Sequence, residues 1–129
     1  MLFLTFNSQD ERRKYCTSSL VEIQFCKLPV GTKPKDLVSV SKIKNWQDES
    51  LYVNDENEFF KEYSEIFNCG MYNNLKSGTV DIYGINYYPP SSIDVIIEKL
   101  RKKQTLDSEV LIEWLNIAKK YNGFYILGI

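Results

Sequence analysis

The chain has 129 residues, of which 43% are hydrophobic and 26% charged, and its formal net charge is −1. These values are typical of a single globular domain and argue against extended disorder. The sequence contains no histidine, the side chain that most often serves as general base or zinc ligand. We therefore expect one domain over residues 1–129 with no hydrolytic triad, no metal and no cofactor, although carboxylates, lysine or tyrosine could still serve an enzyme.

Targeting signals are not evident in the sequence. The apolar run at residues 1–6 is too short for a signal peptide and lacks a basic start. No stretch approaches the roughly 20 apolar residues of a membrane span. Cys16, Cys26 and Cys69 are odd in number and have no CxxC spacing, which favours buried free thiols. These features predict a cytoplasmic protein without membrane contact.

The amino-terminal half is expected to be mainly β-structure. Residues 2–6 form a short apolar run, and the polar residues 7–14 after it indicate a solvated loop or a helical turn. Residues 20–26 alternate between apolar and polar side chains, which predicts a strand with one face on the core. The residues on that face are Val21, Ile23 and Phe25.

The middle of the chain changes its periodicity. Proline and glycine at positions 29–34 indicate a loop, and the β-branched residues at 37–43 predict a second strand. After Asp55 the apolar residues recur about every 3.6 positions, which predicts an amphipathic helix. Asn54 or Asp55 is expected to cap this helix and Gly70 to end it. Its apolar side consists of Phe59, Phe60, Tyr63, Ile66 and Phe67.

The carboxyl-terminal third reads as strand, helix, helix and strand. Residues 79–88 predict a strand, in which Gly84 indicates a bulge or a close backbone approach. Residues 91–94 have the form of a capping box before a second helix, and Asp107 is expected to cap a third. The apolar stripes of these two helices are Ile93, Ile96, Ile97 and Leu100, and then Val110, Leu111, Trp114, Leu115, Ala118 and Tyr121.

Residues 123–129 are almost entirely apolar. Free chain ends are normally polar, so this segment predicts a buried last strand that follows a left-handed glycine, Gly123. The expected fold class is therefore α+β, with a mixed or antiparallel β-sheet packed by about three helices.

The charge is unevenly distributed along the chain. Residues 48–65 contain seven acidic residues and one lysine, a net charge of −6, so the remainder carries +5. Such a segment would attract a basic partner, although a solvated loop and helix face is the alternative explanation. The basic residues are scattered and form no nucleic-acid-binding motif.

Four carboxyl-terminal segments carry a resemblance to a known family: Gly84-Ile85-Asn86-Tyr87-Tyr88, Ile96-Ile97-Glu98, Leu111-Ile112-Glu113-Trp114-Leu115 and residues 121–129. They resemble the CdiI class of immunity proteins from bacterial contact-dependent growth inhibition. The resemblance implies a cytoplasmic, non-enzymatic protein, with no catalytic residues, that binds a cognate CdiA-type carboxyl-terminal toxin domain, and these toxins are often ribonucleases.

A ribonuclease binds a polyanion through a basic cleft, which carboxylates and tyrosines of an inhibitor could occupy. This reasoning places the partner-binding site in the acidic segment. Two alternatives remain, a small enzyme that uses carboxylates or tyrosine and a nucleic-acid-binding accessory protein. The predicted partner-binding residues are Asp48, Glu49, Tyr52, Asp55, Glu56, Glu58 and Glu62.

Overall fold

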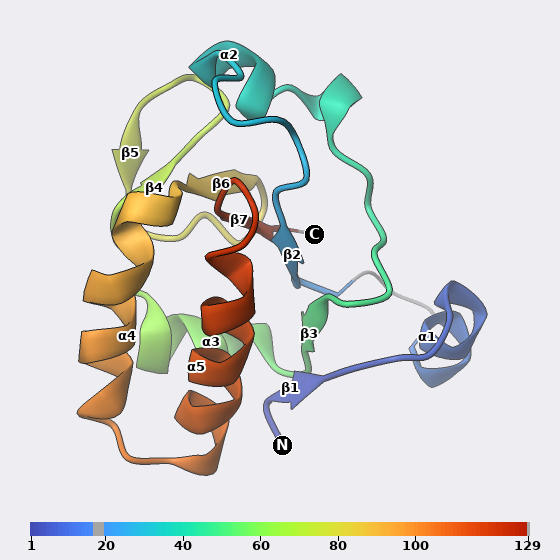
Figure 1. Ribbon diagram of the computed structural model, residues 1–129. Coiled ribbons are helices and arrows are strands. Elements are labelled where there is room, and N and C mark those ends of the chain that lie inside the picture. The colour runs from blue at the N-terminus through green and yellow to red at the C-terminus, as the bar shows by residue number, and fades with distance from the viewer. Residues whose placement is uncertain (17–19, 129) are drawn as a thin grey trace.

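The computed structural model describes residues 1–16 and 20–128. Its described residues form an α+β fold around one antiparallel sheet of seven strands, in the order β1-β3-β2-β7-β6-β4-β5, as expected for the fold class (Figure 1). The strands are β1 (Phe3–Leu4), β2 (Glu22–Phe25), β3 (Leu51–Val53), β4 (Gly70–Met71), β5 (Ser77–Gly78), β6 (Ile85–Tyr88) and β7 (Phe124–Leu127).

Five α-helices and two 3-10 turns accompany the sheet within the described part of the chain. No helix in this part is both long and apolar enough to cross a lipid bilayer. The helices are α1 (Gln9–Tyr15), α2 (Pro34–Leu37), α3 (Glu56–Tyr63), α4 (Ile93–Arg101) and α5 (Leu106–Ala118), and the 3-10 turns are η1 (Val40–Lys42) and η2 (Pro90–Ser92).

The carboxyl-terminal strand β7 lies at the centre of the sheet, between β2 and β6. All four of its residues are buried, so the prediction of a buried last strand is confirmed for residues 124–127, while Ile129 lies outside the described residues. Gly123 precedes β7 with φ +83°, and a Cβ at this position would overlap the carbonyl oxygen of Tyr88. The entry into β7 therefore requires glycine for both conformation and space.

Helices α3, α4 and α5 cover one face of the sheet and form the main core with it (Figure 1). The predicted core face of β2 is confirmed, because Phe25 stacks on Trp114 of α5 with 4.2 Å between ring centroids and on Tyr121 with 4.6 Å. The apolar stripes expected for α4 and α5 also face this core. On α3 the expectation fails for Phe60, which is 40% exposed.

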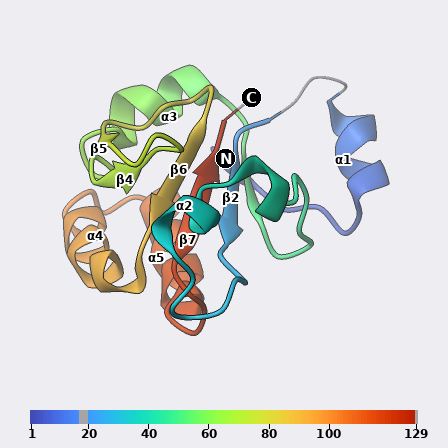
Figure 2. The ribbon, with the colours of Figure 1, turned by 90° about the horizontal axis from the view of Figure 1, so that it is seen from above.

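The opposite face of the sheet is covered by α2 and the chain around it (Figure 2). The strand predicted for residues 37–43 is wrong, because α2 ends at Leu37 and η1 follows. Pro34 occupies the first turn of α2, where its fixed φ favours a helix. Leu37 and Val38 are then both buried, and the Leu37 carbonyl accepts a hydrogen bond of 2.6 Å from the Tyr125 hydroxyl of β7.

The helix caps differ in part from those predicted. Asp55 caps α3, since its side chain accepts a hydrogen bond from the Glu58 N–H, but α3 ends at Tyr63 and not at Gly70. Asp107 does not cap α5. Thr105 does so, in a reciprocal capping box with Ser108.

The capping box predicted at residues 91–94 is also absent. The Ser92 hydroxyl donates to the Pro89 carbonyl instead, because η2 already occupies the positions before α4. By contrast, a helix does form at the polar segment 7–14: α1 covers Gln9–Tyr15, with Ser8 as its cap, and lies to one side of the sheet (Figures 1 and 2).

Candidate partner-binding surface

The predicted partner-binding residues fall into two groups at opposite ends of strand β3. Asp48 and Glu49 belong to the loop 46–50, which leads into β3. The second group begins at Asp55, directly after β3, and continues along α3. Tyr52 lies within β3 itself. The acidic segment is therefore not one continuous patch, since a buried strand divides it.

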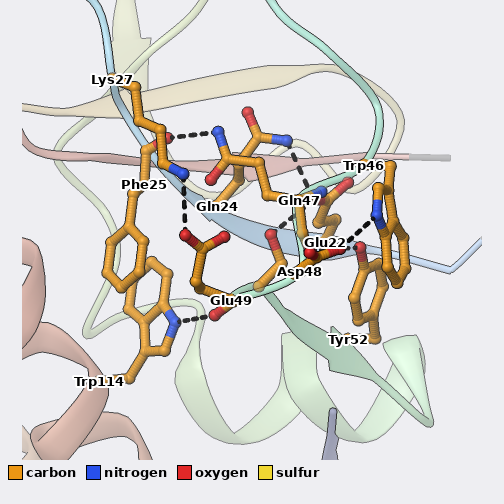
Figure 3. Close-up of polar contacts among 11 residues, drawn as sticks. Glu22, Gln24, Phe25, Lys27, Trp46, Gln47, Asp48, Glu49, Tyr52 and Trp114 are labelled. Carbon is orange, nitrogen blue, oxygen red and sulfur yellow. Dashed lines mark hydrogen bonds and ion pairs between the residues drawn. The ribbon is translucent and has the colours of Figure 1, made fainter. Parts of the chain in front are cut away.

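The loop 46–50 is held by contacts with its neighbours (Figure 3). The Glu49 carboxylate accepts a hydrogen bond of 2.9 Å from the Lys27 ammonium, and the Glu49 carbonyl accepts one of 2.8 Å from the Trp114 indole. The bond from Lys27 lowers the pKa of Glu49. Asp48 accepts a hydrogen bond of 3.0 Å from the Trp46 indole and remains exposed. The carboxylates of this loop therefore have defined positions.

Tyr52 is only 1% exposed. It lies on the sheet face away from α3, α4 and α5, where its ring contacts Phe6 and stacks on Trp46 with 5.2 Å between centroids. Its hydroxyl donates to the Gln47 carbonyl at 3.3 Å. Of the two stacked rings, Trp46 is half-buried and therefore nearer the surface, and Tyr52 packs against its buried side. Side chains of a strand point to its two faces in turn, so Tyr52 lies on the face opposite to that of Leu51 and Val53, which pack in the main core.

Glu22 is a buried carboxylate that the sequence did not single out. Its Oε2 atom accepts hydrogen bonds from the Ser50 hydroxyl at 2.6 Å, the Gln24 amide at 3.0 Å and the Gln47 N–H at 3.2 Å. Burial raises the pKa of Glu22, against the opposing effect of these bonds. Because two of the donors belong to residues 47–50, Glu22 fixes the loop 46–50 to β2 (Figure 3).

Glu22 and Tyr52 are also neighbours across β2 and β3. Burial raises the pKa of both groups, so both favour their neutral forms. The hydrogen bonds that Glu22 accepts from Ser50 and the Gln47 N–H, and the bond from Tyr52 to the Gln47 carbonyl, make the pair a support for the loop 46–50. The alternation of polar and apolar residues in the sequence of β2 could not tell whether Glu22 lies on a buried or on a solvated face.

On α3 the acidic residues have different partners. Asp55 is occupied as the helix cap. Glu62 accepts a hydrogen bond of 3.3 Å from Lys103, whose ammonium lies 5.0 Å from the centre of the Tyr63 ring. In the first turn Glu58 is exposed and Glu56 is half-buried, and the helix dipole favours negative charge there.

The surface carboxylates are suited to receive cationic groups of a partner. Asp48, Glu56 and Glu58 are attached to a capped helix and a supported loop, so little ordering would be required when a partner binds. Among residues 1–16 and 20–128, no three potential ligand side chains gather into a candidate metal site. Comparison of the chain with models of known families, with curated proteins and with solved structures gives no match.

Proposed function

We propose that this chain is a cytoplasmic immunity protein, which binds and neutralises a cognate CdiA-type toxin domain without catalysing a reaction. The observation that supports the proposal best is the set of carboxylates Asp48, Glu56 and Glu58, of which Asp48 and Glu58 are exposed and Glu56 is half-buried. They lie on a loop that buried Glu22 holds and on a helix that Asp55 caps. A toxin that cleaves RNA needs a basic cleft, and these carboxylates would occupy the positions of phosphates.

The physical basis of this role is electrostatic complementarity. Opposite charges across an interface accelerate association and select the correct partner, and salt weakens the attraction. The supported loop and the capped helix add preorganisation, which reduces the entropy lost on binding. A partner surface rich in lysine and arginine is therefore the expected complement.

The test uses the purified carboxyl-terminal domain that is encoded by the reading frame immediately upstream of this chain's gene. Binding is measured by titration at low and at physiological salt, and protection by growth during co-expression. The double variant Glu56→Lys/Glu58→Lys should associate at least about tenfold more slowly at low salt, because attraction is replaced by repulsion. Asp55 stays unchanged, since it caps α3.

The matched control is Glu109→Lys/Glu113→Lys, which changes the net charge equally at exposed positions of α5. It should retain nearly the wild-type association rate. Equal slowing by both variants would indicate a general charge effect and refute the assignment to α3. Failure of the wild-type chain to bind this domain, or to restore growth, would refute the function itself.

A further inference from the structure

The segment between β5 and β6 contains a tight turn at residues 81–84, where the sequence predicted a continuous strand. The Asp81 carboxylate accepts a hydrogen bond of 2.9 Å from the Tyr83 N–H, and the Asp81 carbonyl accepts one of 3.2 Å from the Gly84 N–H. These two bonds close the turn on itself. β6 consequently begins only at Ile85.

Buried Asn86 of β6 fastens this turn to the centre of the sheet. Its amide oxygen accepts a hydrogen bond of 2.8 Å from the Asp81 N–H. Its amide nitrogen donates to the carbonyls of Asp81 and of Ile126 in β7, each at 2.9 Å. The orientation of the turn is therefore fixed by a fully buried side chain.

The chain after β7 holds the turn from a second side. The Gly128 N–H donates to the Gly84 carbonyl at 2.7 Å. A Cβ at Gly128 would lie 2.5 Å from the Ile82 carbonyl oxygen, too close for any other residue without a shift. The close backbone approach is thus at Gly128, whereas a Cβ at Gly84 would meet the Asp81 side chain. These contacts leave the turn little freedom to move.

Tyr83 projects from this fixed turn and is 75% exposed. It borders two hollows, each with a volume of about 300 Å³. One hollow is shared with Tyr72 and Ile43, and the other with Asn57 and the partly exposed Phe60 of α3. An exposed tyrosine on a fixed backbone turn between two concave surfaces has the properties of an interaction hot spot, which is typically aromatic and central.

The charge around Tyr83 indicates what kind of partner would bind there. Among the described residues, Asp81 is the only charged one that lines either hollow, and residues 54–84, counted along the chain, carry six acidic residues and two lysines, a net charge of −4. The partner should therefore be basic, and its arginine or lysine side chains could contact the face of the Tyr83 ring. The same charge disfavours RNA.

We infer that Tyr83 on the turn 81–84 is the anchor of the interface with a basic protein domain. The inference rests on the proposed function and identifies a contact outside the acidic segment 48–65. Because the turn is already ordered, little entropy is lost when the ring is buried by the partner. Removing the ring should then weaken binding more than removing another exposed apolar side chain.

The experiment compares Tyr83→Ala with Leu106→Ala in titrations against the upstream-encoded toxin domain. Leu106 is 78% exposed at the start of α5 and serves as the control. Tyr83→Ala should weaken binding at least about 30-fold, the range of a hot spot, and Leu106→Ala less than threefold. Both side chains are exposed, so thermal unfolding should be unchanged.

The outcomes separate this inference from the function on which it rests. If the wild-type chain binds and Tyr83→Ala binds within threefold of it, the inference is overturned and the function stands. If the wild-type chain does not bind, both fail. A photoreactive benzoylphenylalanine at position 83 should cross-link to the toxin domain, and cross-linking only to a second copy of this chain would also overturn the inference.

Discussion

Replacing Asn86 with alanine tests whether the turn 81–84 is held from the core of the sheet. The substitution removes three hydrogen bonds of 2.8 to 2.9 Å. One lost partner, the Ile126 carbonyl, belongs to a fully buried residue. At about 1 kcal/mol for each bond, the free energy of unfolding should fall by about 3 kcal/mol, a large part of the roughly 5–15 kcal/mol typical of a domain.

Urea denaturation provides the assay, with fluorescence of the buried Trp114 as the signal. Asn116→Ala is the control, because Asn116 is exposed on α5 and should change the unfolding free energy by less than about 0.5 kcal/mol. Proteolysis of the Asn86→Ala variant should also increase at residues 81–84. A loss of less than 1 kcal/mol, with the turn still protected, would refute the role assigned to Asn86.

Two further predictions concern Glu22 and the glycines. Burial raises the pKa of folded Glu22 above 4.5, so its contribution to stability is full below pH 4.5 and is lost as pH rises through the folded pKa. We therefore expect the stability difference, the unfolding free energy of wild type minus that of Glu22→Gln, to decrease as pH rises from 4 to 8. The decrease should be about 1.4 kcal/mol for each unit of pKa shift. A stability difference that does not change with pH would contradict this. Gly31→Ala and Gly123→Ala both place alanine at positive φ, but only the second collides with backbone. Thermal unfolding should show a cost of about 1–2 kcal/mol for Gly31→Ala and a clearly larger one for Gly123→Ala, and equal costs would contradict the packing described at Tyr88.

The elements predicted best are those whose pattern reflects burial on one side. The alternation in β2, the stripes of α4 and α5 and the apolar carboxyl-terminal strand all have this property. The strand predicted at residues 37–43 was wrong because its β-branched residues suit a strand, whereas the burial of Leu37 and Val38 at the end of helix α2 decides the conformation. Propensity is a weak guide where tertiary contacts compete with it.

The acidic segment was recognised from its charge, but sequence could not tell which carboxylates have partners. Lys27 and Lys103 are distant in the sequence from Glu49 and Glu62, with which they pair. The local sequence also predicted one strand over residues 79–88 and gave no reason to place Tyr83 in a turn before β6. That separation depends on the side chain of Asn86, which a strand pattern treats as an ordinary polar position.

Hydrogen exchange of the chain with and without the proposed toxin domain encoded upstream tests the central claim most directly. In the first turn of α3 the Glu58 N–H is bound by the Asp55 cap. The two N–H groups before it have no partners within the helix, so they should exchange rapidly in the free chain. The account predicts that the toxin domain slows exchange in the first turn of α3 and at residues 81–84, while α1 is unaffected. Protection confined to α1 or to the exposed side of α5 would contradict it.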